Sequence, residues 1–146
     1  MLHGHGGGML RQLVGDIGEE LALEYEKKRL KRNGYKYLLS LVEHISPIDN
    51  TAGYDIRSCA GIGKKPEERI YIEVKNTVEN SFQFIWSFNE QKVGQKLGNS
   101  YWIYCFRSAI VTDRTAKGPL RIKNPIECVS PPDYVIEKRD IFVKKN

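Results

Sequence analysis

The sequence RIYIEVKN at residues 69–76 decides the fold, because its apolar and polar side chains alternate with period two. Such alternation is typical of a β-strand, in which successive side chains point to opposite faces of a sheet. The three aliphatic residues of this stretch are expected on a core face. Tyr71, Glu73 and Lys75 are expected on the other face, which should be polar.

A second strand is predicted immediately upstream, over residues 53–59 (GYDIRSC). A polar loop rich in glycine and proline, residues 61–68, separates it from the first stretch. Two strands joined in this way form an antiparallel hairpin. The hairpin would place Asp55 on the strand next to the one that carries Glu73.

A long amphipathic helix is predicted before the hairpin, over residues 9–33, because apolar residues recur there at three- and four-residue spacing. An Asn-Gly pair marks its end. A stripe of small residues on this helix, Gly15, Gly18 and Ala22, would let another part of the backbone approach closely.

The remaining segments complete an α/β sandwich. Strands are predicted over residues 41–46, 82–87 and 101–107, and the last of these is apolar enough to be buried. Ser87 and Glu90 fit a capping box that opens a short second helix. Helices and strands in this order predict a mixed central β-sheet flanked by helices.

The chain has 146 residues, enough for one hydrophobic core, and we expect a single domain over residues 1–146. Residues 1–8 are expected to be a flexible leader and residues 9–107 the core. Residues 108–146 form an extension of unassigned role, with an edge strand expected at residues 134–137. No apolar run reaches the ~18 residues of a membrane span. The three cysteines lack zinc-finger spacing, so we expect a cytoplasmic protein with reduced thiols.

The formal net charge of +5 permits a nucleic acid as partner, because Lys and Arg neutralise phosphates whatever the base sequence. Two basic clusters are candidate nucleic-acid contacts. Lys28 and Arg32 lie at the end of the first helix, and Lys64 and Lys65 lie at the tip of the hairpin. Cations at a helix C-terminus also suit the helix dipole, so a structural role for the first pair stays open.

Glu73 and Lys75 carry the chemistry that this pattern favours. Side chains two residues apart on a strand are separated by about 6.6–7 Å at Cα, so both can address one bound water or metal ion. Asp55 can add a second carboxylate, and two converging carboxylates repel unless a cation such as Mg²⁺ lies between them. The set outlines a phosphodiester-hydrolysing site in which the lysine orients water and stabilises negative charge. The alternative is a solvated strand face with a loose ion pair of about 0–1 kcal/mol.

Six short motifs of the chain together resemble the NO VEIN C-terminal domain family. The resemblance covers about residues 15–107. That family is similar to the PD-(D/E)XK, restriction-endonuclease-like superfamily, which implies a mixed sheet flanked by helices. The motifs are GDIGEE at 15–20, EYE at 24–26, GYDI at 53–56, IEVK at 72–75, SFNE at 87–90 and YWIY at 101–104.

The resemblance also implies roles for individual residues. Tyr54 stands where the superfamily pattern has proline, and nothing after residue 107 has a counterpart. Glu20 competes with Glu19 for the role of the helix acid, and either could be an ordinary acid favoured by the helix dipole. The implied catalytic set is Asp55, Glu73, Lys75 and Glu19, and the implied metal ligands are Asp55, Glu73 and Val74.

Together these features predict a Mg²⁺-dependent endonuclease that hydrolyses DNA, with Mn²⁺ as a substitute metal. Cutting both strands of a duplex needs two sites, so a homodimer is expected. The resemblance implies a setting in restriction, defence or repair. Two alternatives from other classes are a nuclease fold that binds nucleic acid without cutting it, and a protein-interaction domain of a larger system.

Overall fold

A five-stranded mixed sheet forms the centre of the molecule. The computed structural model describes residues 2–137 and 142–146. β3 and β5 are parallel, and the other neighbouring strands of this sheet are antiparallel. The predicted mixed α/β class is therefore confirmed. The strands, in their order across the sheet, are β1 (Glu43–His44), β2 (Ile56–Cys59), β3 (Arg69–Lys75), β5 (Tyr101–Ile110) and β6 (Thr115–Lys123).

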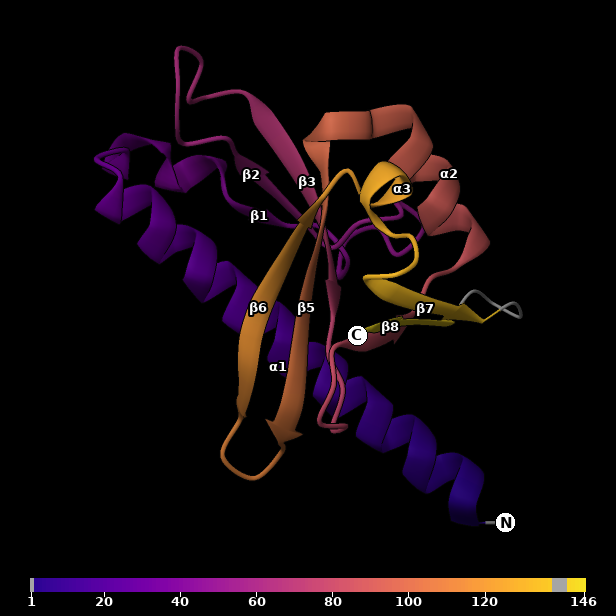
Figure 1. Ribbon diagram of the computed structural model, residues 1–146. Coiled ribbons are helices and arrows are strands. Elements are labelled where there is room, and N and C mark those ends of the chain that lie inside the picture. The colour runs from indigo at the N-terminus through magenta and orange to yellow at the C-terminus, as the bar shows by residue number, and fades with distance from the viewer. Residues whose placement is uncertain (1, 138–141) are drawn as a thin grey trace.

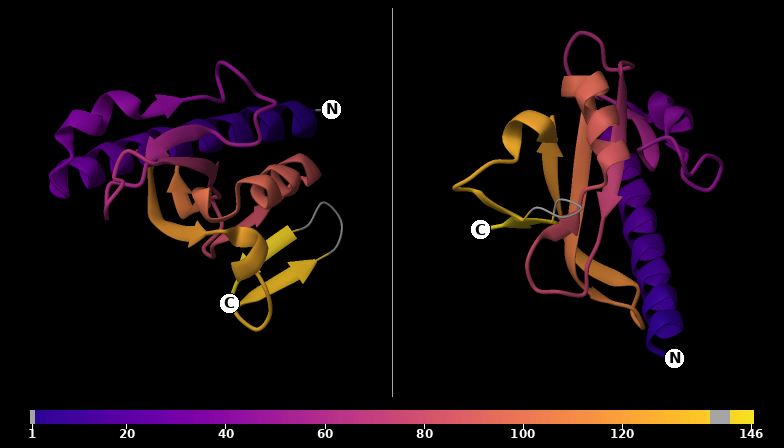
Figure 2. Two further views of the ribbon diagram at one scale, coloured as in Figure 1. Left: turned by 90° about the horizontal axis from the view of Figure 1, so that it is seen from above. Right: turned by 90° about the vertical axis from the view of Figure 1, so that its right-hand side faces the viewer.

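Both faces of this sheet are covered. The long helix α1 (Leu2–Arg32) crosses one face, and the helix α2 (Phe88–Leu97) lies on the other with a small second sheet (Figures 1 and 2). The second sheet has the order β4-β8-β7. Its strands are β4 (Gln83–Ile85), β7 (Tyr134–Glu137) and β8 (Phe142–Lys145), and the short helices are η1 (Lys36–Leu41), η2 (Gly98–Ser100) and α3 (Pro125–Cys128).

The alternation of side chains along β5 separates two hydrophobic cores. Tyr101 and Ile103 pack with the second sheet and α2, whereas Trp102 and Tyr104 pack toward α1. The predicted alternation along residues 69–76 is confirmed, but the face that carries Glu73 and Lys75 is buried rather than open to solvent. Glu73 lies on the face that α2 covers and is only 7% exposed.

The first helix is longer than predicted. It begins at Leu2, so the backbone of the glycine-rich segment, expected to be a flexible leader, continues the helix. Extending an existing helix adds one hydrogen bond for each residue that is ordered, so the helical segment that follows favours this continuation despite the glycines. The C-terminal end, at Arg32, lies within one residue of the prediction.

The hairpin and the second helix are confirmed. Strands β1, β2 and β4 are shorter than predicted. β2 pairs antiparallel with β3, and α2 begins with both hydrogen bonds of the capping box. Residues 36–41 form a 3-10 helix, which leaves only Glu43–His44 for the first strand. β7 lies at a sheet edge as expected, whereas β6 and β8 had no prediction.

Two further expectations concern membrane spans and cysteines. Within the described part of the chain, no helix has the length and apolarity needed to span a bilayer. Cys59 and Cys105 are buried and Cys128 is exposed, and all three are free thiols.

Close packing between α1 and β3 depends on the small residues of α1. Gly18 and Ala22 are buried against the sheet, and a Cβ placed on Gly18 would lie 2.9 Å from the Cβ of Asn76 and 3.2 Å from Val74 Cγ1. The Asn76 side chain also donates a hydrogen bond to the Val14 carbonyl. A Cβ on Gly15 would meet nothing within 4 Å, so the third member of the predicted stripe does not take part.

We expect Gly18→Ala to lower the free energy of unfolding by about 1–3 kcal/mol, because the added methyl group overpacks the contact between α1 and β3. Gly15→Ala is the matched control on the same helix. It should raise stability by up to about 1 kcal/mol, because alanine favours the helix and meets no neighbour. Urea unfolding followed by circular dichroism measures both changes. Equal effects of the two substitutions would contradict the close approach at Gly18.

Candidate active site

Asp55 is held against the end of β3 by two main-chain contacts. Its N–H donates to the carbonyl of Ile72 at 2.8 Å, and its Oδ2 accepts from the N–H of Val74 at 2.8 Å. The residue directly precedes β2, so its position follows from the hairpin pairing of β2 with β3. The carboxylate is thereby placed beside Glu73, as the hairpin argument predicts.

Glu73 and Lys75 form a buried pair rather than a solvated one. Lys75 Nζ lies 3.3 Å from Glu73 Oε2, and the two side chains are only 14% and 10% exposed. A loose surface ion pair requires solvent around both groups. The alternative interpretation of these residues as a solvated strand face is therefore wrong.

Glu90 brings the second helix into the site. Its Oε1 accepts from Lys75 Nζ at 2.7 Å and also from the N–H of Ser87 at 3.1 Å. The capping box is completed by Ser87 Oγ, which accepts from the Glu90 N–H at 3.2 Å. The sequence indicated only the cap, because nothing in local spacing shows that the start of α2 lies over the end of β3.

An acidic cavity of about 370 Å³ lies at this junction. Four carboxyl groups line it, from the loop after β1, the residue before β2, strand β3 and helix α2. No lysine or arginine of the described residues lines this cavity. The Lys75 ammonium pairs with Glu73 and Glu90 instead. The four acids are Asp49, Asp55, Glu73 and Glu90.

The structure distinguishes the two candidate acids of α1. Glu19 Oε1 lies 2.5 Å from His44 Nε2 and accepts from Ser46 Oγ at 2.5 Å. Glu20 is exposed and pairs with Arg114 at 2.8 Å. Only Glu19 is therefore directed toward the site, and the sequence did not indicate that His44 is its partner.

Electrostatic crowding perturbs the ionisable groups of the cavity. Burial, and then the charge of Glu19, raises the pKa of Asp55 from 3.8 to about 6. Burial also raises the pKa of Glu73 well above its usual range; Lys75 opposes this effect and Asp55 adds to it. Burial alone would lower the pKa of Lys75, but its two carboxylate partners outweigh that effect and raise it. Perturbed groups of this kind cluster at functional sites.

Tyr101 supports the loop at Gly53, which lines the site, and it was not predicted to take part. Its hydroxyl donates to the carbonyl of Gly53 at 2.9 Å. Burial raises its pKa, and the nearby carboxylates of Glu73, Glu90 and Asp55 raise it further, so the hydroxyl stays protonated. Gly53 has a φ of +82°, and a Cβ there would lie 2.6 Å from Val93, which explains why a glycine begins this motif.

The donor set fits a hard divalent cation held by few protein ligands. Asp55 and Glu73 supply two carboxylates that line one cavity, and Mg²⁺ binds one or two carboxylates together with waters. The side chain of Val74 packs toward α1, so only its main chain can take part in metal binding. No group of three or more His, Cys, Asp or Glu side chains in the described part of the chain has the spacing of a fuller protein cage.

The four predicted nucleic-acid contacts lie away from this cavity. Lys64 and Lys65 are exposed in the loop at the other end of the hairpin, and Lys28 is exposed and pairs with Glu24 at 2.7 Å. The five steps along the strand from Glu68 to Glu73 alone span about 17 Å. Arg32 lies at the C-terminal end of α1, near the same loop, where Asn33 donates to the Gly61 carbonyl.

The chain matches the model of a known protein family. The family model described as "Protein NO VEIN, C-terminal" matches residues 18–119. The match includes Asp55, Glu73, Val74 and Lys75 and extends beyond the resemblance expected up to residue 107. No curated protein and no solved structure matches the chain.

The raised pKa of Asp55 predicts a stability that depends on pH. The folded protein binds this proton more tightly than the unfolded chain, so the wild type loses stability as pH rises from 3.8 to about 6. Asp55→Asn removes the charge and keeps an acceptor for the Val74 N–H. We expect this variant to be more stable than the wild type by about 1–3 kcal/mol above pH 6, and the difference to disappear below pH 4.

Urea unfolding at a series of pH values measures this difference. Glu79→Gln is the matched control, because Glu79 is exposed and its side chain makes no hydrogen bond or ion pair with the described residues. It should leave stability unchanged at every pH. An Asp55→Asn variant that is less stable than the wild type at pH 8 would contradict the crowding of carboxylates.

Proposed function

This chain belongs to the family of the NO VEIN C-terminal domain, and on that basis we propose that it is a metal-dependent endonuclease with a PD-(D/E)XK, restriction-endonuclease-like core. The observation that carries the proposal is that Asp55 and Glu73 line one cavity and that Lys75 pairs with Glu73. The proposed substrate is DNA, the proposed metal is Mg²⁺ with Mn²⁺ as a substitute, and the proposed setting is restriction, defence or repair.

The architecture supports the superfamily assignment. The two acids come from adjacent antiparallel strands at one end of a mixed sheet, with α1 on one face and α2 on the other. Glu19 reaches the same end of the sheet from α1. A sheet flanked by helices, with acids from two strands and one helix, is the arrangement that the superfamily resemblance implies.

In the proposed phosphodiester hydrolysis, each residue of the site has a separate role. A divalent cation held by Asp55 and Glu73, with the main chain at Val74, would supply an acidic water and neutralise the phosphate. Lys75 stays protonated and stabilises the negative charge that develops on the phosphate. Glu90 positions the ammonium, and the Val74 N–H positions the Asp55 carboxylate.

The acidic cavity explains why a cation belongs to the proposal. Four carboxyl groups line it, and a phosphodiester would be repelled by ionised acids. A bound divalent ion reverses the local charge and lowers the pKa values of its ligands. The proposed cleavage therefore depends on metal and rises with pH as Asp55 and Glu73 lose their protons.

A nuclease fold that binds nucleic acid without cutting it is the second candidate. The observation that favours it is the position of Lys64, Lys65 and Arg32, which lie at the end of the hairpin remote from the acidic cavity. Binding there would not require the acids to act. The experiment that follows separates the two functions.

We expect the protein to nick or linearise supercoiled plasmid with Mg²⁺ or Mn²⁺ and to be inactive with EDTA. Asp55→Asn, Glu73→Gln and Lys75→Ala should each lower the cleavage rate at least about a hundredfold, because each removes part of the site that acts on the transition state. Gel electrophoresis of timed samples measures the rate. A homodimer would convert plasmid to the linear form with little nicked intermediate, since two sites cut both strands.

The matched controls for this assay are Glu79→Gln and Lys144→Ala, which change exposed side chains of the same types. They should cleave like the wild type. Plasmid that is retarded but uncut with either metal would support the binding module instead. Cleavage that persists in all three site variants would refute the assignment of the site.

Metal binding has a readout that is independent of cleavage. Mn²⁺ should raise the melting temperature of the wild type at pH 7.5, because it relieves the repulsion between Asp55 and Glu73 and binds only the folded site. Asp55→Asn and Glu73→Gln should lose this increase, and Glu79→Gln should keep it. Thermal scans with NaCl at equal ionic strength control for screening. An equal increase in all variants would argue against a cation between these two acids.

A further inference from the structure

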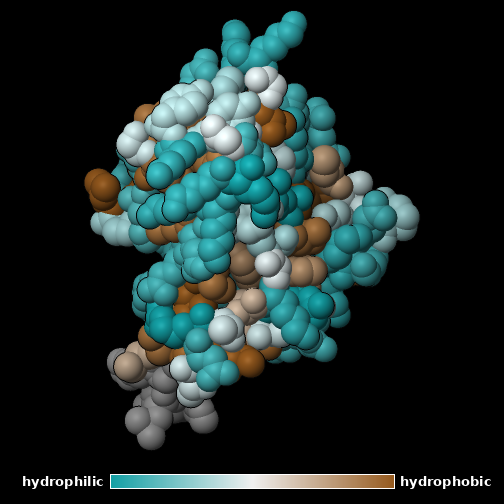
Figure 3. All heavy atoms as spheres, turned by 90° about the vertical axis from the view of Figure 1, so that its left-hand side faces the viewer, coloured by the Kyte–Doolittle hydropathy of each residue, from teal (hydrophilic) through white to brown (hydrophobic). Residues whose placement is uncertain are grey.

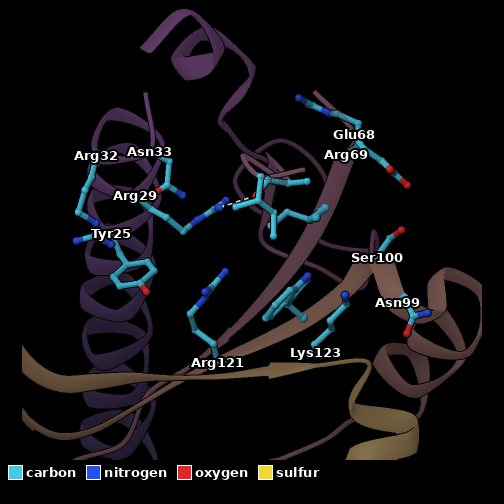
Figure 4. A pocket seen from close by; sticks show the side chains of 14 residues that line it. Tyr25, Arg29, Arg32, Asn33, Glu68, Arg69, Asn99, Ser100, Arg121 and Lys123 are labelled. Carbon is cyan, nitrogen blue, oxygen red and sulfur yellow. Dashed lines mark hydrogen bonds between the residues drawn. The ribbon is translucent and has the colours of Figure 1, made fainter. Parts of the chain in front are cut away.

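A second cavity, of about 440 Å³, lies on the opposite side of the sheet from the acidic one. It is bounded by the C-terminal part of α1, by the starts of β3 and β5 and by the end of β6 (Figure 4). Trp102 lines it, whereas its neighbour Tyr101 faces the acidic cavity side, because successive side chains of β5 point to opposite faces. The two cavities are therefore separated by the sheet.

The lining of this second cavity is strongly basic. Five cationic side chains and one acid, Glu68, contribute to it. Its volume is within the range of about 300–1,000 Å³ that is typical of small-molecule sites. The outer face of the molecule around the C-terminal half of α1 is largely hydrophilic, with small separate hydrophobic groups (Figure 3). The five cations are Arg29, Arg32, Arg69, Arg121 and Lys123.

Two of these cations are neutralised within the fold. Arg29 forms a bidentate pair with the fully buried Glu26 at 2.7 and 2.9 Å and also donates to the carbonyls of Cys59 and Ala60. Arg69 pairs with Glu43. No carboxylate of the described residues lies within 4 Å of the charged groups of the other three, which are Arg32, Arg121 and Lys123.

Arg121 is held rigidly by aromatic rings. Its guanidinium carbon lies 4.6 Å from the ring centre of Trp102, 5.2 Å from that of Tyr104 and 5.6 Å from that of Tyr25. Its Nε donates to the Tyr104 hydroxyl at 2.9 Å, and this hydroxyl donates to Glu26. With Nε used in this way, the two terminal nitrogens keep donors for a ligand in a fixed orientation.

Lys123 adds a second cation on the same side of β6. Its Nζ lies 5.8 Å from the centre of the Trp102 ring, and the Lys123 and Arg121 side chains both rise from β6 into the cavity (Figure 4). A planar guanidinium fork and an ammonium that line one cavity suit the oxygens of a phosphate group. Tyr25 and Trp102 supply aromatic surface of the kind on which nucleobases stack.

We propose that this basic cavity binds a nucleotide unit, with its phosphate on Arg121 and Lys123 and its base against the aromatic lining. The volume, the uncompensated cations and the aromatic surface all fit one phosphate joined to one base. The unit can come from a free mononucleotide or from the 5′-phosphorylated end of a strand. The proposal rests on this cavity alone and does not depend on hydrolysis at the acidic site.

The test uses the full chain in EDTA, so that cleavage plays no part, and isothermal titration calorimetry with AMP, adenosine and a 5′-phosphorylated thymidine octamer. We expect AMP to bind at least about tenfold more tightly than adenosine, because the phosphate receives charge-assisted hydrogen bonds. Tight binding of AMP alone identifies a free nucleotide as the ligand. Tighter binding of the octamer, lost when its 5′-phosphate is removed, identifies a strand end.

Two matched variants localise the binding. Lys123→Ala should weaken the binding of the phosphorylated ligand about fivefold or more, and Arg121→Gln more strongly. Lys117→Ala is the control, because Lys117 is an exposed lysine of the same strand that does not line the cavity. Lys123 is exposed as well, so its replacement does not threaten folding.

Tryptophan fluorescence gives a second readout at the site. Trp86 and Trp102 are the two tryptophans, and Trp86 lies in the other core. In Trp86→Phe, the emission of Trp102 should be quenched by AMP at the concentrations that saturate in calorimetry with the wild type. Absence of binding by AMP and by the octamer up to millimolar concentration would overturn the proposal. Equal affinity for adenosine and AMP, or an equal loss in Lys117→Ala and Lys123→Ala, would overturn it too.

Discussion

The site depends on the burial of one ammonium group between two carboxylates from different elements. Lys75 reaches Glu73 on its own strand and Glu90 on α2, and all three side chains are largely shielded from water. Removing one partner of such a buried set leaves an uncompensated charge, which is costly. The same Glu90 oxygen caps α2, so the bond that holds Lys75 also fixes the start of α2 over the end of β3. The acidic cavity lies at this junction.

Asp55, another acid of the cavity, has no comparable compensation. Asp55 accepts a main-chain N–H, yet burial and Glu19 still raise its pKa. A fold under selection for stability alone would not place these acids together, because the charge of Glu19 disfavours the ionised form of Asp55 and the charge of Asp55 disfavours that of Glu73. Local destabilisation of this kind is the expected cost of a functional site. A ligand that carries positive charge would convert the repulsion into binding energy.

The strands and turns that carry the site could be predicted from the sequence. The contacts that these elements make across the fold could not. Period-two alternation identified β3, and the polar loop after β2 identified the hairpin, which together place Asp55 beside Glu73. The Lys75–Glu90 pair escaped prediction because it depends on the path of the chain between β3 and α2. β6 escaped because Gly118, Pro119 and charged residues interrupt its apolar pattern, although its pairing with β5 is long. Arg121 could therefore not be linked to Trp102.

The two cavities carry opposite charge, which the net charge of +5 does not show. Acids gather on the α2 side of the sheet at the end of β3, and uncompensated cations gather on the α1 side at the end of β6. A polyanion is attracted to the second region and repelled by the first unless a cation is bound there. The proposed nucleotide binding and the proposed phosphodiester hydrolysis are therefore separable in this molecule, since each would depend on side chains on its own face of the sheet.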